Sequence, residues 1–202
     1  DTEFIGFILG SDKLSSSKGA EILDSDNISV SRAAEILASD SLSTEKAAEL
    51  LTQETFRADK AASLFASDIL DVAKSASILQ SENMDASKGA EILQSGSLNA
   101  VKAAGILNSS QIGATRAGEI IDDDVLSAAK AASILLEVED TKTGNILEVV
   151  TNLKVESIID ELPEQKLVGA LPEMTAVKLH TLDINVLFDN LPSVPTEQIT
   201  RE

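Results

Sequence analysis

A column of basic residues at fixed spacing constrains this chain more than any other feature. Lysine or arginine stands at every fourteenth position from 18 to 130 and then at every twelfth position to 178. These residues, which we call the basic ladder, are Lys18, Arg32, Lys46, Lys60, Lys74, Lys88, Lys102, Arg116 and Lys130, followed by Lys142, Lys154, Lys166 and Lys178. So strict an internal period indicates a repeat protein in which each unit packs on its neighbours.

Within one unit, the apolar residues have helical spacing. Val30, Ala33, Ala34 and Leu37 stand at i, i+3, i+4 and i+7, which places them on one face of a helix. Hydroxyl, carboxyl or amide side chains precede these stretches in the N-cap position: Ser29, Ser43, Asp71, Asp85, Asn99 and Ser127. Each unit is therefore predicted to be one helix of roughly nine residues and a turn, too short to be stable without stacking.

The predicted fold is all-α: an α-solenoid, or superhelix, of single short helices. Residues 1–141 form an array of 14-residue repeats, and residues 142–202 continue the same solenoid with 12-residue Leu-Pro-type repeats. All four prolines of the chain lie in the second part. Residues 192–202 are polar and contain two of these prolines, so we expect this C-terminal end to fray.

Two sequence patterns carry a resemblance to a known family. Leu162-Pro163-Glu164 is followed by Ala170-Leu171-Pro172, and Ala-Ala-Glu-Ile-Leu and Ala-Ala-Glu-Leu-Leu helices stand upstream at 33–37 and 47–51. This pattern resembles the cytoplasmic N domain of MgtE-type magnesium transporters, a superhelix of very short helices. The resemblance implies a cytoplasmic regulatory domain that responds to divalent cations. Long arrays rich in Ser, Ala and Asp also resemble repeat regions of archaeal and bacterial cell-surface proteins, and we favour that second interpretation.

Composition excludes several classes of function. The formal net charge of −18 has the same sign as nucleic acids and anionic membranes, so we expect neither as a direct partner. The longest apolar run, from Phe4 to Leu9, is far shorter than a membrane span. With no cysteine and one histidine, His180, neither a thiol nucleophile nor a zinc site can be assembled. We therefore predict a protein that is not an enzyme, needs no cofactor and does not insert into the membrane.

The basic ladder has two interpretations. As a functional feature, it is a positive stripe that docks an acidic partner. As a structural feature, which we favour, it pairs with an acidic ladder eight positions further along each unit. The acidic ladder consists of Asp12, Asp26, Asp40, Glu54, Asp68, Glu82 and Asp124.

A few residues carry weaker predictions of binding or modification. Asp122, Asp123 and Asp124 crowd three carboxylates into one turn, a candidate for weak, non-specific binding of Mg²⁺ or Ca²⁺, although a solvated turn is the favoured interpretation. Asn27 and Asn108 begin N-glycosylation acceptor motifs, which adds slight weight to an extracellular location.

The predicted role is that of a spacer or partner-binding segment in a larger protein at the cell surface, with a cytoplasmic location as the alternative. The chain begins with Asp1 and has no signal-type leader, so we expect a processed piece of that protein. Expected partners are another protein or neighbouring domains of the same chain. Phe4, Ile5 and Phe7 at the first helix mark a solenoid end through which a homo-oligomer could form.

Overall fold

The computed structural model describes residues 2–190 of the 202-residue chain. Within this range it contains fifteen α-helices, one 3-10 helix and no strand. In chain order the elements are α1 (Thr2–Leu9), α2 (Ser16–Asp24), α3 (Val30–Ala38), α4 (Thr44–Leu51), α5 (Ala58–Ala66), α6 (Val72–Gln80), α7 (Ala86–Gln94), α8 (Ala100–Asn108), α9 (Ala114–Asp122), α10 (Ala128–Glu137), α11 (Asp140–Val149), α12 (Asn152–Ile159), α13 (Glu164–Ala170), the 3-10 helix η1 (Leu171–Glu173), α14 (Ala176–Thr181) and α15 (Ile184–Asn190). The all-α class expected from the sequence is confirmed.

The helices begin where the sequence places capping residues. Of the six predicted N-caps, Ser29, Ser43, Asp71, Asn99 and Ser127 each accept a hydrogen bond from the backbone N–H three residues later. These bonds satisfy one of the amides that the first turn of a helix leaves without a partner. Asp85 also occupies an N-cap, but its side chain makes no capping bond. The capping pattern therefore predicted the helix starts well, although not every individual bond.

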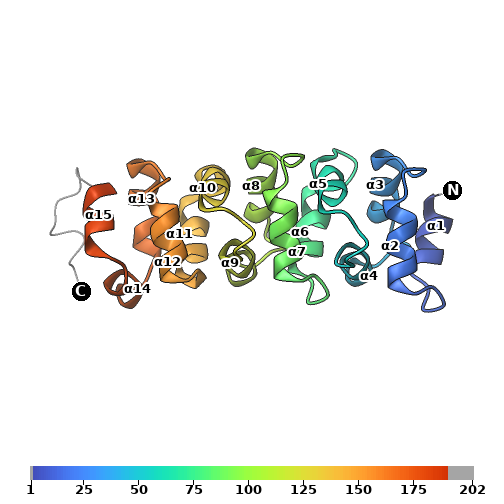
Figure 1. Cartoon of the computed structure of the whole chain (residues 1–202), viewed down its shortest axis with the longest axis horizontal. Coiled ribbons are helices and arrows are strands. Elements are labelled where there is room, and N and C mark those ends of the chain that lie inside the picture. Colours follow the sequence, from blue (N-terminus) through green and yellow to red (C-terminus); the bar gives the residue numbers. More distant parts are fainter. Residues whose placement is uncertain (1, 191–202) are drawn as a thin grey trace.

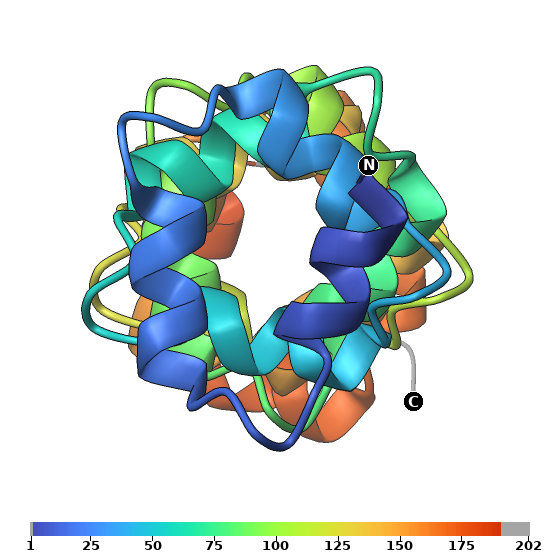
Figure 2. The ribbon, with the colours of Figure 1, turned by 90° about the vertical axis from the view of Figure 1, so that its right-hand side faces the viewer.

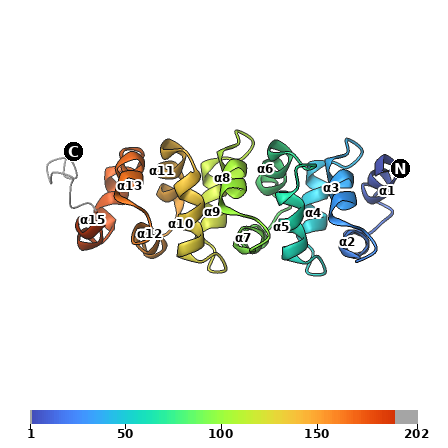
Figure 3. The ribbon, with the colours of Figure 1, turned by 90° about the horizontal axis from the view of Figure 1, so that it is seen from above.

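Neighbours in space are not neighbours in sequence. Each helix packs mainly on the helix two places along the chain, so α1 packs on α3, α2 on α4 and α3 on α5, and this rule continues to α11 and α13. Two interleaved stacks result, one of odd-numbered and one of even-numbered helices. The molecule is elongated, with α1 and α15 at opposite ends (Figures 1 and 3). Seen along the rod, the helices surround the long axis on all sides (Figure 2).

The core is a set of repeated columns. The paired apolar residues near the helix ends are fully buried in α3 to α12, as Ile36 and Leu37 in α3 and Leu50 and Leu51 in α4 illustrate. Burying such a side chain contributes about 1.5–3 kcal/mol. From Leu42 to Val150 the apolar residue before the N-cap, such as Phe56, is buried as well, where it can pack against the first turn. Repetition of these columns gives one continuous hydrophobic core along the rod.

Small residues let the stacked helices approach closely. A Cβ atom added to Gly118 of α9 would lie 2.7 Å from the Cβ of Val149 in α11. Real Cβ atoms do not approach so closely, so a larger residue here would push α9 and α11 apart. Two places after each basic residue from Lys18 to Lys142 the chain carries Ala or Gly, and this restriction follows from that packing.

Beyond α10 the turns shorten, and the packing rule persists as far as α13, whereas α12 contacts α15, three places along. α11 to α14 begin at residues 140, 152, 164 and 176, and α11 packs on both α9 and α13. Pro163 is the N-cap residue of α13, and Pro172 lies in η1. Our expectation that residues 192–202 fray concerns a segment outside the described residues.

Candidate functional site

Every ladder residue from Lys18 to Lys178 occupies the third position of its helix. In several helices the backbone amide of the ladder residue donates a hydrogen bond to the N-cap hydroxyl. The Arg32 amide donates to Ser29 Oγ at 3.2 Å, and the Lys46 amide donates to Ser43 Oγ at 3.1 Å. Helical side chains point back toward the N-terminus of their helix, so the basic groups extend toward the turns. A positive charge at this end opposes the helix dipole, and its recurrence requires a compensating partner.

That partner is a backbone carbonyl of the turn that precedes the helix two places earlier. Nine ladder residues donate to the carbonyl oxygen of the residue before an N-cap. The pairs are Lys60 with Ile28, Lys74 with Leu42, Lys88 with Phe56, Arg116 with Met84, Lys130 with Leu98, Lys142 with Ile112, Lys154 with Leu126, Lys166 with Val138, and Lys178 with Val150. These carbonyls lie outside the helical hydrogen-bond ladder and need a donor when buried.

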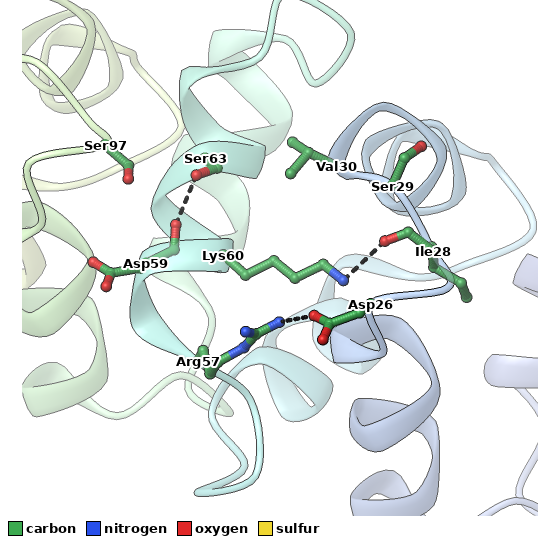
Figure 4. A pocket seen from close by; sticks show the side chains of 9 residues that line it. All are labelled: Asp26, Ile28, Ser29, Val30, Arg57, Asp59, Lys60, Ser63 and Ser97. Atoms are coloured by element: carbon green, nitrogen blue, oxygen red, sulfur yellow. Dashed lines mark hydrogen bonds and ion pairs between the residues drawn. The ribbon is translucent and has the colours of Figure 1, made fainter.

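Lys60 shows the arrangement in detail. Its Nζ donates to the carbonyl of Ser25 at 2.8 Å and to that of Ile28 at 3.0 Å. Figure 4 shows the side chain crossing from α5 to the turn before α3. Burial lowers the pKa of Lys60 from its ordinary value, and the nearby carboxylate of Asp24 opposes this shift. The ammonium group thus joins α5 to the α2–α3 turn at a desolvation cost that the two carbonyl bonds offset.

An open depression of about 390 Å³ surrounds this contact and is lined by Asp26, Arg57, Asp59 and Lys60 among others (Figure 4). The guanidinium of Arg57 donates to Asp24 Oδ2 at 2.8 Å and to Asp26 Oδ1 at 3.0 Å, and these two hydrogen bonds raise the pKa of Arg57. Both basic groups of the depression are therefore engaged by protein acceptors. The depression offers no free cation for an acidic ligand.

The acidic ladder expected from the sequence is not the main partner of the basic ladder. Lys102 reaches Asp68 Oδ1 at 3.3 Å, and Asp26 pairs with Arg57, which is not a ladder residue. Within residues 2–190, no ion pair joins the basic ladder to the remaining members, Asp12, Asp40, Glu54, Glu82 and Asp124. The carboxylates of Asp26 and Asp68 are 93% and 103% exposed, because this place is the outer tip of the turn. The carbonyls of the same turns face the neighbouring helix and receive the basic groups instead.

Intrahelical pairs neutralise part of the ladder charge. A glutamate three positions after the basic residue forms an ion pair in five helices: Lys18 with Glu21, Arg32 with Glu35, Lys46 with Glu49, Lys88 with Glu91 and Arg116 with Glu119. Lys46 also donates to Ser16 Oγ at 2.7 Å. The hydroxyl of Ser16 in turn donates to Glu49, and this bond, with that from Lys46, lowers the pKa of Glu49.

A second column of contacts was missed in the sequence. The residue six places after the basic residue accepts the backbone N–H of an N-cap residue about two units later. Gln80 Oε1 accepts from the Gly113 amide at 2.7 Å, and Gln94 Oε1 from the Ser127 amide at 3.0 Å. The same place supplies Asp24, Thr52, Asn108 and Asp122 as acceptors for the amides of Arg57, Asp85, Glu139 and Thr151. The available signal was an acceptor side chain at six of the nine such positions in the 14-residue units, the exceptions being Ala38, Ala66 and Leu136.

Two of the three consecutive aspartates have roles in this scaffold, while Asp124 is exposed. Asp122 Oδ1 accepts from the backbone amide and the hydroxyl of Thr151, at 2.9 and 2.8 Å. Asp123 caps the end of α9, and its Oδ1 accepts from the Val125 amide at 3.0 Å. Across residues 2–190, no group of three or more acidic or histidine side chains is arranged to hold a metal ion.

The two glycosylation motifs lie in different surroundings. Asn27 is exposed in the turn between α2 and α3. Asn108 is half-buried, and its Oδ1 accepts from the Glu139 amide at 3.0 Å. An attached glycan is therefore easier to accommodate at Asn27. His180 is an exposed residue of α14 near the C-terminal end of the rod.

Comparison with models of protein families, with curated proteins and with solved structures finds no match. What this chain does must therefore be inferred from its own geometry. Among the helices of residues 2–190, none is both long and apolar enough to cross a membrane.

The ladder is thus a mechanical feature. Nine of the thirteen basic groups join their helix to the turn that precedes the helix two places earlier. The acceptor column joins the end of one helix to the start of the helix three places later. Charge-assisted hydrogen bonds of this kind each contribute about 1.5–3 kcal/mol. Repeated along the rod, they fix the spacing of both helix stacks.

Proposed function

We propose that this chain is a non-catalytic structural module, a superhelical spacer or partner-binding segment of a larger protein at the cell surface. The observation that carries the proposal is the continuity of the carbonyl contacts through the change of period. Lys60 and Lys130 lie 32 residues after their acceptors, and Lys154 and Lys166 lie 28 residues after theirs. The same joint is thus rebuilt with shorter turns, as selection for a continuous rod would require.

The two sections of the chain form a single superhelix in this proposal, with 14-residue repeats over 1–141 and 12-residue repeats over 142–202. In such an array each unit contacts only near neighbours, and an extended surface remains for partners. The buried ladder supports a structural role over a docking role. The side chains of Lys88, Arg116 and Lys166 are only 11%, 15% and 7% exposed, so little of their charge is offered to a partner.

Thermal unfolding in the presence of divalent cations tests this proposal against the cytoplasmic alternative. A regulatory domain of the MgtE type would be stabilised by millimolar Mg²⁺ or Ca²⁺ well beyond the effect of monovalent salt at matched ionic strength. A spacer whose carboxylates point separately into solvent would show the same shift with either kind of salt. A cation-specific shift would overturn our proposal in favour of the alternative.

Small-angle scattering adds an independent measurement of shape. A spacer must keep its length, so the maximum dimension of the particle should be unchanged between low and high salt and with added Mg²⁺. A rod that shortens or bends on adding the cation would point to a conformational switch instead. Glycan occupancy at Asn27 in the native protein tests the location separately. A protein at the cell surface is expected to carry a glycan at this site.

A further inference from the structure

The connection between α5 and α6 differs from its neighbours in its backbone hydrogen bonds. In the other connections from α1 to α10, the amide of the apolar residue before the N-cap donates to the carbonyl three residues earlier, as Leu42 does to Ser39 at 3.2 Å. The amide of Leu70 makes no such bond to Ser67, and residues 67–70 form a bend without a hydrogen-bonded turn. This connection therefore lacks the bond that closes the neighbouring turns.

The ladder contact to this connection is also missing. The carbonyl of Leu70 occupies the place at which the Leu42 carbonyl accepts from Lys74. The residue in position to donate is Lys102, but its Nζ lies 3.3 Å from Asp68 Oδ1 instead. Across residues 2–190, no side chain donates to the Leu70 carbonyl. Because the Asp68 carboxylate is fully exposed, its ion pair with Lys102 is screened by salt and holds the connection weakly.

The acceptor column has gaps on both sides of the same connection. The amide of Asp71 has Ala38 at the place of its acceptor, and Ala66 at the end of α5 stands at the place of the acceptor for the Asn99 amide. An alanine side chain has no hydrogen-bonding group. Asp71 does cap α6 by accepting from the Lys74 amide at 2.6 Å, so α6 begins firmly while the residues before it are poorly tied.

No other connection in the described part of the chain lacks all three contacts. The Leu14 carbonyl has no ladder donor either, but the Leu14 amide closes its own turn on Ser11 at 3.1 Å. The Asn99 amide lacks its acceptor, yet the carbonyl of Leu98 accepts from Lys130 at 2.9 Å. The shorter connections beyond α10 each keep at least one of these bonds.

A buried leucine is the main contact that keeps the α5–α6 connection closed. Leu70 is fully buried, as Leu42 and Leu98 are at the same place in their units, whereas the adjacent Ile69 is 41% exposed. Apolar burial is non-directional, so it holds the leucine in the core without fixing the backbone around it. In the other connections hydrogen bonds must also break before the turn can move, so opening is least costly here.

We propose that the α5–α6 connection is the point at which the folded rod opens locally, and that an endopeptidase cuts the folded chain there first. Opening moves residues 67–70 away from the core, while α5 stays packed on α3 and α7, and α6 on α4 and α8. The cut adds one water molecule across a peptide bond and leaves a carboxylate on one piece and an amino group on the other. The inference rests on the hydrogen-bond pattern and stands whether or not the spacer role is correct.

Thiol labelling of the folded protein measures the opening, since the chain contains no cysteine of its own. Leu70→Cys places a thiol at the buried position of this connection, and Leu98→Cys is the matched control at the equivalent buried position between α7 and α8. The rate of reaction with a maleimide follows the population of the open form. Leu70→Cys should react at least tenfold faster, because its connection lacks the ladder bond. Equal rates, with intact helices by circular dichroism in both variants, would contradict the proposal.

Ladder substitutions separate the two connections further. Lys130→Gln removes the donor of the Leu98 carbonyl and should speed labelling of the Leu98→Cys variant about tenfold, as expected for losing one charge-assisted hydrogen bond. Lys102→Gln removes only the exposed pair with Asp68 and should speed labelling of the Leu70→Cys variant less than about threefold. The reverse order would mean that Lys102 holds its connection as firmly as the ladder bonds do, which the proposal denies.

Supplying a missing acceptor should close the connection. Ala38→Gln gives the Asp71 amide an acceptor and should slow labelling of the Leu70→Cys variant about twofold. Labelling of the Leu98→Cys variant should not change, because the Asn99 amide still faces Ala66. Equal slowing in both backgrounds would show an effect on the whole fold and would count against a local opening.

Limited proteolysis of the unmodified chain tests the cut itself. With subtilisin under native conditions, the first cut between α2 and α13 should fall within residues 66–71, as mass spectrometry of the pieces can show. The two pieces should elute together in size-exclusion chromatography and separate in denaturant, because α4 packs on α6 and α5 on α7 across the cut. A first cut in another connection of this range, or none before the helices unfold, overturns the proposal.

Discussion

At the scale of single residues, a lysine near the start of a helix is normally unfavourable because its charge opposes the helix dipole. Here the same position lets the side chain reach a carbonyl of a neighbouring turn. Lys74 illustrates this with one acceptor, the carbonyl of Leu42 at 3.2 Å. A buried carbonyl without a donor is costly. The single bond from the ladder residue therefore supplies the carbonyl with a donor and the positive charge with an acceptor.

Lys74→Gln should therefore destabilise the fold. The shorter amide cannot reach the Leu42 carbonyl, and we expect a loss of about 1–2 kcal/mol in the free energy of unfolding, measured by denaturant titration. Lys13→Gln is the matched control, because Lys13 is exposed and outside the ladder, and it should change stability by less than about 0.5 kcal/mol. Equal effects of the two substitutions would show that the carbonyl contact contributes nothing.

Lys60 makes a prediction about pH. Burial lowers its pKa in the folded state below the 10.5 of the unfolded chain, so between these values the unfolded chain binds more protons. The penalty for the buried charge is fully present below the folded-state pKa and disappears as pH rises past 10.5. Wild-type stability relative to that of Lys60→Gln should thus rise from pH 8 to pH 11, measured by denaturant titration at each pH. A constant difference would contradict the lowered pKa.

At the scale of helices, spacing in the stacks is controlled by the smallest side chains. Gly144 of α11 is buried, and a Cβ atom there would overlap the carbonyl oxygen of Ala170 at the end of α13 and the side chain of Glu173. A backbone carbonyl cannot rotate away as the end of a flexible side chain can. The contact between α11 and α13 therefore depends on glycine at this position.

Gly144→Ala should cost about 1–3 kcal/mol of stability, because α11 and α13 must separate to admit the methyl group. Gly105→Ala is the opposite case in the middle of α8, where an added Cβ meets no atom within 4 Å. That substitution should stabilise the protein by about 0.5–1 kcal/mol, through the better helix propensity of alanine. Thermal melts of the two variants should therefore shift in opposite directions.

The acceptors six places after the basic residue form a column in which substitution can remove one member or add a missing one. Gln80→Ala deletes the acceptor of the Gly113 amide and should cost about 0.5–1 kcal/mol. Ala38 is an exposed residue at the same place in its unit, and the N-cap residue 33 positions later is Asp71. Ala38→Gln should supply the missing acceptor and raise stability by a few tenths of a kcal/mol, up to about 0.5. Destabilisation by Ala38→Gln would show that the column is not transferable between units.

At the scale of the whole molecule, periodicity in the sequence was enough to predict short stacked helices and most of their caps. It could not show which unit each helix contacts, because a repeating pattern presents the same face to every neighbour. The expected ion pairs with Asp40 or Glu54 are absent from the described residues partly for this reason. In addition, the acceptors of Lys74 and Lys88 are backbone carbonyls. Every residue has such a carbonyl, so the sequence does not mark which one accepts. The acceptor role of Gln80 was also missed, because a polar side chain at the end of a helix is usually exposed to solvent and has no partner in the protein.

The packing rule makes a final prediction about how the rod opens. Stability in a repeat array is a sum of unit and neighbour contributions, so helices that bury few core residues should unfold locally first. Ile8 of α1 is 40% exposed, and α14 has no buried residue. Native-state hydrogen exchange should show the least protection in α1 and α14 and the greatest protection in α6 to α9. Lys74→Gln should lower protection both in α6 and around the α3–α4 turn, since the lost bond joins these two segments. Uniform protection along the rod, or a loss confined to α6, would mean that the ladder does not couple helices across the stack.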